Sequence, residues 1–235
     1  MKFVAIIPAR KNSKGLTNKN YKLFNKKPLI YWTIKSAIQS KCFEKIIVST
    51  DSTKIQKISQ KMGVECPVLR PKKLSGDKIN VHKVVKYVMN FYKKKDSSFQ
   101  PDAIVLLQPT SPLREYSDIR KCCKIFNKSK PDSLVSVLKV PHNFNPKNLY
   151  SLKNNFLISL SKKKKLLQRQ QQNLFYARNG ASIYITKSIK LNKYILGGKI
   201  KGYLMNNLKS IDINDKNDFS LAEIAQNKFR YNTIK

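Results

Sequence analysis

Short apolar runs and longer amphipathic stretches alternate along the first 140 residues of the chain. The apolar runs have the length of β-strands and fall at residues 2–7, 45–51, 64–70, 102–109 and 133–140. The stretches with apolar residues at helical spacing fall at residues 28–40, 52–63, 80–95 and 116–129. This alternation predicts an α/β fold, namely a doubly wound, mostly parallel sheet with right-handed crossovers.

The alternation breaks between about residues 141 and 172, where the chain is polar and rich in Asn and Lys. Within this region only residues 154–160 have a clear strand pattern. Strand patterns resume at residues 180–186 and 200–205, and a last helical pattern covers residues 217–229. Because the sequence has neither internal repeats nor a flexible linker, we expect a single domain over residues 1–235. The insertion at 141–172 is expected to reach outside the sheet as a hairpin or arm.

The chain is strongly basic, with 48 Lys and Arg against 13 Asp and Glu and a net charge of +35. Such an excess is typical of proteins that bind nucleic acid. Here it is mostly Lys and is spread along the chain, whereas nucleic-acid readers concentrate Arg and aromatic residues on one element. The densest run, Lys162–Lys165, is typical of a solvated turn or helix face. A nucleic-acid-binding protein stays an alternative, but we expect no nucleic-acid partner.

Membrane segments and cysteine motifs are missing from the sequence pattern. No apolar stretch approaches the roughly 18 residues of a membrane span, and the N-terminal run lacks the cleavage-type site of a signal peptide. The cysteines, Cys42, Cys66, Cys122 and Cys123, have no metal-type spacing and make a poor disulfide framework. We therefore expect a cytoplasmic protein with no membrane partner and with cysteines that serve no site.

Charged and polar residues follow three of the predicted strands at their carboxyl ends. They are Arg10, Lys14 and Lys19 after the first strand, Arg70 after the third, and Gln108, Thr110 and Arg114 after the central strand. Loops at the carboxyl ends of parallel strands converge on one edge of the sheet. The three loops together predict a site for an anionic ligand of nucleotide size.

The first of these loops, "ARKNSKGLTNKN" at residues 9–20, has an unusual composition for a phosphate site. It lacks both the Gly-Lys-Ser/Thr ending of a Walker loop and the GxGxxG fingerprint of a dinucleotide site. With one glycine it cannot cradle a phosphate by backbone N–H groups alone, so cationic side chains must supply the countercharge. Taken alone, the loop is compatible with phosphate binding or with a solvated surface.

The stretches "IIPARKNSKGLTNKN" and "LLQPTSPLR" resemble the CMP-sugar synthetases, and in particular the acylneuraminate cytidylyltransferases. The stretches "IIVSTD", "VLRP", "YARNGASIYIT" and "SIDIN…DFSLAE" follow in the family's order, so the resemblance covers almost the whole chain. It implies an α/β sheet of the nucleotide-diphospho-sugar transferase type, a dimerisation excursion where the pattern breaks, and a homodimer. The implied reaction joins CTP to a nonulosonic (sialic-acid-like) sugar acid and releases pyrophosphate, for surface-glycan biosynthesis.

The resemblance also implies roles for residues that bind the nucleotide. Lys14 would face the leaving pyrophosphate, with Arg10 and Lys19 on the remaining phosphates and Asn20 in the matching position after them. Three further residues match the part of the family that recognises cytosine and ribose, and they are Arg70, Ser75 and Asp77. The family therefore implies that cations of the first loop act on the charge that develops as pyrophosphate leaves.

A second set of residues is implied to bind the sugar acid. Gln108 and Thr110 match the face that reads the sugar, although this turn is also of a kind that stabilises itself. Segments by which one subunit completes its partner's pocket contain Lys147, Arg169, Arg178 and Asn179. Their cations would face the carboxylate of the sugar. His142, a single His beside Pro141, is interpreted as structural because nothing nearby would tune its pKa.

The segment "SIDIN" matches the family's pair of metal-binding aspartates, whose spacing of two puts both on one side of a strand. The resemblance implies Mg²⁺, which bridges phosphate oxygens. The first position is Asp212, but the second is Asn214, whose oxygen is neutral. Metal binding would then rely on water, on the adjacent Asp215 or on substrate phosphates. A purely structural interpretation, in which this segment caps the last helix, stays open.

The sequence constrains the choice of sugar acid less than it constrains the choice of family. A CMP-Kdo-type synthetase, which uses an eight-carbon acid, has the same fold and is the alternative within this class. "RQQQ" at residues 169–172 and "YARNG" at residues 176–180 favour the nine-carbon branch. "PHNFNP" at residues 141–146 points to the legionaminic type within it.

Overall fold

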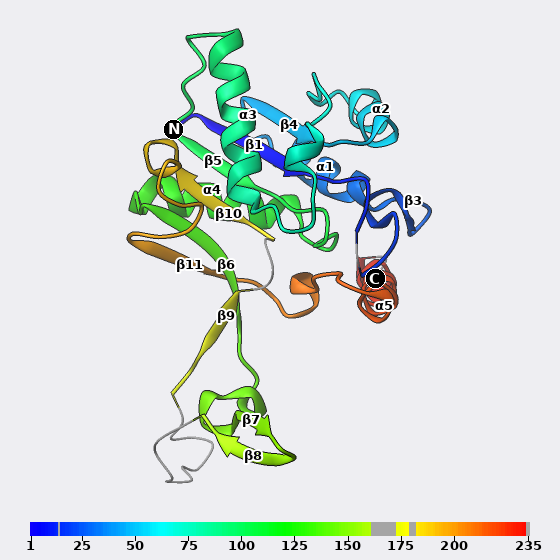
Figure 1. Ribbon diagram of the computed structural model, residues 1–235, viewed down its shortest axis with the longest axis vertical. Coiled ribbons are helices and arrows are strands. Elements are labelled where there is room, and N and C mark those ends of the chain that lie inside the picture. The colour runs from blue at the N-terminus through cyan, green and yellow to red at the C-terminus, as the bar shows by residue number, and fades with distance from the viewer. Residues whose placement is uncertain (14, 161–172, 179–181, 234–235) are drawn as a thin grey trace.

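The computed structural model describes residues 1–13, 15–160, 173–178 and 182–233. Five strands of its central sheet share one direction, and β10 and β9 run opposite to them. The order across the sheet is β11 (Ile200–Leu204), β6 (Ser133–Lys139), β10 (Tyr184–Lys187), β5 (Ala103–Leu106), β1 (Phe3–Pro8) and β4 (Lys45–Ser49), with β9 (Tyr176–Arg178) paired to β6 (Figure 1). The predicted α/β fold with a mostly parallel sheet is confirmed.

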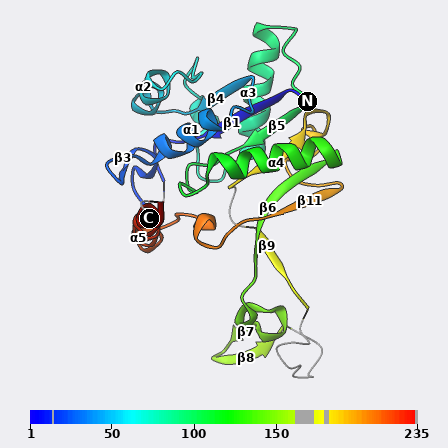
Figure 2. The same cartoon turned by 180° about the vertical axis from the view of Figure 1, so that it is seen from behind.

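Helices cover both faces of this sheet, as the two opposite views show (Figures 1 and 2). One face carries α1 (Leu29–Ser40), α2 (Thr53–Lys61) and α4 (Tyr116–Ser129), and the other carries α3 (Val81–Lys95). Ala5 and Ile7 of β1 belong to the first core, and Val4 and Ile6 to the second. Because alternate residues of a strand face opposite sides, both sets are buried, and the strand reads as a continuous apolar run.

Local sequence signals set the ends of several helices. The helix α4 begins with a capping box in which Glu115 N–H donates to Asp118 Oδ2 at 3.1 Å. Ser52 caps α2 by accepting a hydrogen bond from Ile55 N. Past the end of α2, Gly63 has φ +73°, a left-handed conformation that favours glycine. These signals act within a few residues, which is why the helix boundaries agree closely with the sequence pattern.

The prediction of a strand at residues 64–70 is wrong. The chain there forms only an isolated bridge, in which Val48 N donates to Glu65 O at 2.8 Å and Glu65 N to Ile46 O at 2.9 Å. Pro67 follows two residues later and has no N–H to continue a ladder. The segment nevertheless ends at the same edge of the sheet, because Arg70 N donates to Thr50 O at 2.6 Å.

A third apolar cluster lies beside the sheet and joins the loops at its carboxyl edge. The last helix, α5 (Lys216–Thr233), packs Phe219 and Ala222 against Phe24 of the short hairpin β2 (Leu23–Phe24) and β3 (Lys27–Pro28). Residues from three loops also belong to this cluster, and they are Leu16, Leu113 and Ile213. The cluster therefore fixes loops from the beginning, middle and end of the chain next to one another.

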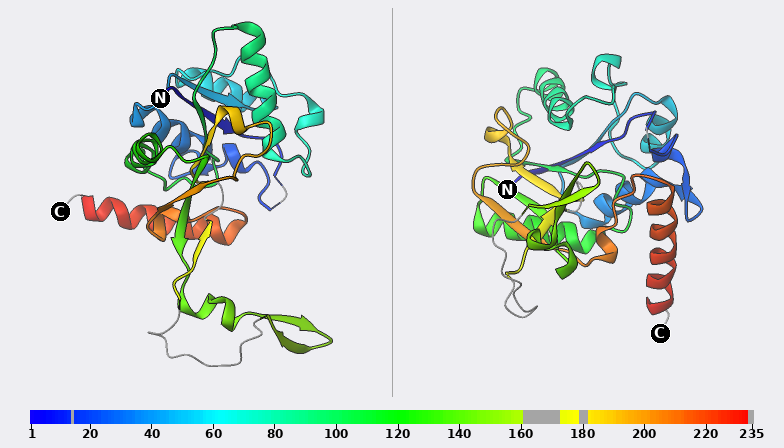
Figure 3. Two further views of the ribbon diagram at one scale, coloured as in Figure 1. Left: turned by 90° about the vertical axis from the view of Figure 1, so that its left-hand side faces the viewer. Right: turned by 60° about the horizontal axis from the view of Figure 1, so that its bottom comes forward.

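Residues 140–160 and 173–175, between β6 and β9, belong to an arm that projects away from the sheet (Figures 1 and 3). The arm leaves along β6 and returns along β9, and between them lies the hairpin β7 (Tyr150–Lys153) and β8 (Phe156–Ser159). Every residue of this hairpin is exposed, including Phe156 at 77% and Leu152 at 69%.

Among the described helices of the protein, none is both long and apolar enough to span a membrane.

Candidate active site

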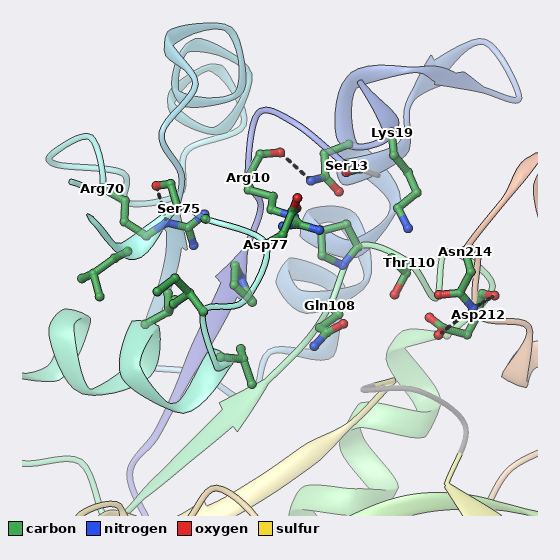
Figure 4. Close-up of a pocket in the computed structure, with 18 residues that line it drawn as sticks. Arg10, Ser13, Lys19, Arg70, Ser75, Asp77, Gln108, Thr110, Asp212 and Asn214 are labelled. Atoms are coloured by element: carbon green, nitrogen blue, oxygen red, sulfur yellow. Dashed lines mark hydrogen bonds and ion pairs between the residues drawn. The ribbon is translucent and has the colours of Figure 1, made fainter. Parts of the chain in front are cut away.

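A cavity of about 270 Å³ lies at the carboxyl edge of the sheet, beyond β1 and β5 (Figure 4). Four loop segments contribute to it, namely the loop after β1, residues 70–79, the loop after β5, and residues 212–214, and α3 adds Val81 and Val84. It brings together predicted residues from all four, namely Arg10, Lys19, Asn20, Arg70, Ser75, Asp77, Gln108, Thr110, Asp212 and Asn214. The three strand-end loops therefore meet, and the segment before α5 joins them.

The loop after β1 is held by its own side chains and by the far end of the sequence. Asn20 is buried and its Nδ2 donates to Arg10 O at 2.8 Å. Gly15 lies so close to residue 214 that an added Cβ would be 2.2 Å from the carbonyl oxygen of Asn214. No side chain fits at that distance, so this glycine is required for the approach of the two segments. Lys14, the residue before it, lies outside the described residues.

Cations and carboxylates of different loops are paired across the cavity. Arg10 Nη1 forms an ion pair with Asp77 Oδ1, which joins the loop after β1 to residues 70–79. Figure 4 shows this pair between Arg70 on one side and Asp212 on the other. Burial lowers the pKa of Lys19, an effect to which Arg10 adds and which Asp212 opposes. The cavity thus has positive charge along its length, with carboxylates spaced between the cations.

Arg70 is fixed at one end of the cavity with its guanidinium nearly buried. Its Nε donates to Ser75 Oγ at 3.2 Å, and Ser75 Oγ donates to Pro71 O at 3.2 Å. Asp51 lies 3.8 Å from its Nη2 and also accepts from Lys11 N at 2.7 Å. Burial lowers the pKa of Arg70, and the Asp51 carboxylate opposes that shift. Asp51 was not a predicted site residue, although the polar end of the second strand was a visible signal.

The loop after β5 presents polar groups to the cavity on a fixed backbone. Thr110 O accepts from Ile213 N at 2.8 Å, which joins this loop to the segment before α5. The Thr110 hydroxyl is buried and has no hydrogen-bond partner among the described residues, so it is available to a ligand. Arg114 was predicted at the rim with Gln108 and Thr110. It instead lies behind the loop and is only 2% exposed, because its guanidinium binds interior carbonyls.

The segment 212–214 contains a buried acceptor that nothing in the described chain satisfies. This acceptor is Asp212 Oδ1, whereas Asp212 Oδ2 accepts a long hydrogen bond from Asn214 Nδ2 at 3.4 Å. Asp215 Oδ1 accepts from Asn217 N and Asp218 N at the start of α5, so this carboxylate caps the helix. The alternative in which Asp215 provides the second metal carboxylate therefore does not fit the geometry.

A divalent cation fits the donor set at this end of the cavity. Within the described part of the chain, no group of three or more His, Cys, Asp and Glu is placed to hold a metal. Mg²⁺ needs no such cage, because it commonly takes one or two carboxylates, substrate phosphates and water. The unsatisfied Asp212 Oδ1, beside the amide of Asn214, is an acceptor of the kind that Mg²⁺ prefers.

Two of the residues predicted to bind the sugar acid, Lys147 and Arg178, do not line the cavity of their own chain. Lys147 lies in the short turn Pro146–Asn148 of the arm, together with His142 nearby. Arg178, on β9, forms a side-chain hydrogen bond with Tyr184. Arg169 and Asn179 lie outside the described residues.

Comparison with known proteins places the chain in a family. The cytidylyltransferase profile matches residues 4–235. The N-acylneuraminate cytidylyltransferase of Escherichia coli is 35% identical over 232 residues, which cover 97% of this chain and 52% of that protein. The CMP-N,N'-diacetyllegionaminic acid synthase of Legionella pneumophila is 36% identical over 236 residues, which cover 95% of each protein. This chain thus spans about half the length of the E. coli relative, and nearly all of the Legionella one.

A solved structure gives the same assignment of fold at lower sequence identity. The synthetase of CMP:2-keto-3-deoxy-manno-octonic acid, solved with CTP, superposes with a TM-score of 0.73 at 13% identity. The alignment covers 97% of this chain and all of that one, so the fold extends over the whole described sheet. The family predicted from the loop sequences is confirmed: this chain belongs to the cytidylyltransferase family.

Proposed function

We propose that this chain transfers CMP from CTP to a nonulosonic, sialic-acid-like sugar acid, and that it serves surface-glycan biosynthesis. One observation carries the proposal. A single cavity joins three cationic side chains, Arg10, Lys19 and Arg70, to the unsatisfied Asp212 Oδ1, and these are groups that a nucleoside triphosphate with its metal requires. The names of the E. coli and Legionella relatives support the choice of substrates.

The bound CTP would extend along the cavity. Arg70, with Ser75 and Asp77 beside it, would take the cytidine end, because its fixed, planar donors suit a base edge. The triphosphate would lie toward Arg10 and Lys19, with Lys14 at the departing end and Asn20 holding the loop. The phosphates would compete with Asp77 for Arg10, so the ion pair between them marks a position for an anion.

In the reaction, the anomeric oxygen of the sugar acid forms a bond to the α-phosphorus of CTP. The bond from that phosphorus to the oxygen bridging to the β-phosphate breaks, pyrophosphate leaves, and the hydroxyl proton passes to solvent water. Negative charge grows on the departing oxygens, so cations fixed nearby bind the transition state more tightly than the ground state. Lys14, Arg10 and Lys19 would supply this charge, and Asp212 would complete the catalytic set.

We further propose Mg²⁺ as the cofactor, held by Asp212 with Asn214 as a weaker or indirect ligand. When bound, the ion neutralises phosphate charge and polarises the reacting phosphoryl group. Asp212 Oδ1 is the anionic ligand that the segment offers, and the hydrogen bond from Asn214 orients the same carboxylate. The segment is itself oriented by Thr110 and Lys19, so the acceptor points toward the triphosphate end of the cavity.

The sugar acid would bind beyond Gln108 and Thr110, and we propose that a second copy of the chain completes this half of the site. The arm that carries Lys147 projects away from the sheet (Figure 3). Large apolar side chains of the arm, such as Phe156 and Leu157, are exposed at 77% and 68%. Exposed apolar patches of this kind indicate an interface. In a C2 homodimer, Lys147, Arg169, Arg178 and Asn179 would face the carboxylate of the sugar in the partner's site.

A nine-carbon acid of the legionaminic type is the expected substrate within this class, because the Legionella relative matches along almost its full length. The CMP-Kdo-type alternative has the support of the structural neighbour, whose likeness extends to the fold alone. CTP and its sugar-acid acceptors are made inside the cell, so this proposal places the enzyme in the cytoplasm.

Pyrophosphate release measures the proposed activity directly. We expect release with CTP, Mg²⁺ and N,N'-diacetyllegionaminic or N-acetylneuraminic acid, and little with Kdo or with UTP, ATP or GTP. A site that hydrogen-bonds a base edge rejects analogues that leave its polar groups without partners. Equal turnover with UTP contradicts the proposal. The nucleic-acid alternative is tested by binding at rising salt, since such affinity falls steeply with ionic strength.

A further inference from the structure

Arg114 lies behind the cavity and joins three segments that are distant in sequence. Its Nη1 donates to Ser182 O at 2.6 Å and to Gln108 O at 3.3 Å, and its Nη2 donates to Thr33 Oγ1 at 2.9 Å. These acceptors belong to the segment just before β10, the loop after β5 and the middle of α1. One side chain therefore joins Gln108, which lies after β5, and Ser182, which lies before β10, to each other and to α1.

The charge of Arg114 is unusual for its surroundings. The residue is 2% exposed, and none of the ion pairs between described residues includes it. Burial lowers its pKa to about 9, and the nearby Asp118 opposes the shift, so the guanidinium still carries its charge at neutral pH. A buried cation destabilises a fold unless its hydrogen bonds are well satisfied. Two carbonyls and a hydroxyl satisfy Nη1 and Nη2 here, whereas Nε has no hydrogen-bond partner among the described residues.

The contact between Arg114 and the carbonyl of Gln108 sets the direction of the Gln108 side chain. The carbonyl of Gln108 is turned into the interior, where Arg114 Nη1 and Thr33 Oγ1, the latter at 3.5 Å, both approach it. Leu107 N, one residue earlier, still continues the strand pairing by donating to Ile6 O at 3.0 Å. With its backbone fixed in this way, Gln108 presents its side chain to the cavity (Figure 4).

The contact with Ser182 fixes the other side of the same region. Ser182 is fully buried and lies two residues before β10, and the next residue, Ile183, donates its N–H to Ser136 Oγ at 3.1 Å. It follows the segment that includes Arg178 by four residues. The carbonyl that Arg114 holds therefore lies where the chain leads into β10.

We propose that Arg114 is a positioning residue for the sugar-acid half of the site, where it fixes the backbones of Gln108 and Ser182 relative to each other. This inference rests on the proposed function. Arg114 does not touch the ligand, and it acts through the two backbones that it joins. A lysine at this position cannot replace it, because a single ammonium on a flexible stem cannot reach three acceptors in three segments as a planar guanidinium does.

The test compares Arg114→Lys with Arg120→Lys. Arg120 is a matched control, because its Nε and Nη2 also donate to main-chain carbonyls, those of Ser40 and Gln39, at 2.9 and 3.0 Å. These contacts lie at the end of α1, away from the residues that line the cavity. We expect Arg114→Lys to raise the KM for the sugar acid about tenfold, as the loss of one good hydrogen bond does, and to leave the KM for CTP within about twofold. Arg120→Lys should change neither constant.

A purely structural role predicts a different result. If Arg114→Lys lowers the melting temperature but leaves the KM for the sugar acid as in the wild type, the proposal is wrong. If Arg114→Lys does not fold, Thr33→Val tests the same contact by removing one acceptor. It should raise the KM for the sugar acid by a smaller factor of about threefold, and an unchanged KM would overturn the proposal.

A second readout separates this inference from the proposed function. Hydrogen exchange is measured on the full-length protein without substrates. We expect Arg114→Lys to speed exchange at residues 107–113 and 182–187, and not at residues 45–49 of β4. If the wild type releases no pyrophosphate with any sugar acid, the proposed function fails while this prediction can still hold. A uniform increase over the whole sheet, or no increase, would overturn the positioning role.

Discussion

The Nζ atom of Lys19 donates a hydrogen bond of 2.6 Å to the carbonyl oxygen of Ile213, although the two residues are 194 positions apart. This bond attaches the loop after β1 to the segment that carries Asp212 and Asn214. Burial lowers the pKa of Lys19, Arg10 lowers it further, and Asp212 and Asp218 oppose the shift. Lys19 can supply positive charge to a phosphate only while its side chain is protonated.

The first prediction concerns the pH dependence of turnover. An amine with a lowered pKa loses its proton at a lower pH than an ordinary lysine, so kcat/KM for CTP should fall on the alkaline side earlier than expected for free Lys. Lys19→Arg stays charged over this range and should move the fall to higher pH. The exposed Lys11→Arg serves as control and should leave the profile unchanged. Identical profiles for Lys19→Arg and the wild type would show that Lys19 does not set this limit.

The second prediction concerns the metal. Asp212→Asn removes the anionic ligand and should abolish Mg²⁺-dependent turnover, whereas Asn214→Asp should lower the Mg²⁺ concentration that half-saturates the enzyme. Asp215→Ala should keep the wild-type Mg²⁺ dependence and lose about 1 kcal/mol of stability, because that side chain caps α5.

Titration of Mg²⁺ against turnover and thermal unfolding of each variant separate these outcomes. Mn²⁺ binding in the absence of sugar acid gives a readout that does not depend on activity. Full activity in Asp212→Asn would remove Asp212 from the metal site, and an inactive but folded Asp215→Ala would give it a role there.

The third prediction concerns assembly. If the arm completes a partner's site, Arg10→Ala and Lys147→Ala chains should each be nearly inactive as homodimers. After random exchange of subunits, half of the dimers are mixed, and each mixed dimer has one intact site. The mixture should therefore recover about a quarter of wild-type activity. Mass measurement in solution verifies the mixed dimers, and no recovery in verified dimers would assign Lys147 to its own subunit.

The fourth prediction concerns a thiol outside the site. A hydrogen bond with the Cys123 thiol lowers the pKa of Cys42 to about 6, although partial burial opposes the shift. Cys42 should then form a thiolate more readily than an ordinary cysteine and react with iodoacetamide before the buried Cys66, whose pKa burial raises to about 11. Peptide mass mapping of partly labelled protein measures the order. In Cys123→Ala this preference should disappear, and labelling of Cys42 at an unchanged rate would contradict the hydrogen bond.

The fold could be predicted well wherever local signals decide the structure. The helix expected at residues 116–129 has those bounds in the structure, because Glu115 and Asp118 cap it within one turn. The strand expected at residues 64–70 does not form, because Pro67 interrupts the pairing. Pro67 is a local signal, but the prediction gave more weight to the apolar pattern of the segment. The antiparallel direction of β10 was not predictable from the sequence pattern, since a buried strand reads as the same apolar run in either direction.

The sequence predicted which strand-end loops surround the cavity, but not the direction in which each of their side chains points. Topology alone brings the carboxyl ends of parallel strands together, so Arg10, Arg70 and Gln108 were expected at one edge. Which way a loop residue points depends on partners elsewhere in the chain. Arg114 turns inward because its acceptors come from α1 and β10, and no pattern within the loop contains that information.

The contacts of residues 212–214 with Gly15, Lys19 and Thr110 have a consequence for synthesis of the chain. A nascent polypeptide that has emerged as far as Leu204 already contains every described strand of the central sheet. It still lacks the segment against which the loop after β1 closes. The sheet can therefore assemble on the ribosome while the nucleotide site stays open, and a chain that stops before Asp212 would retain the scaffold but not the site.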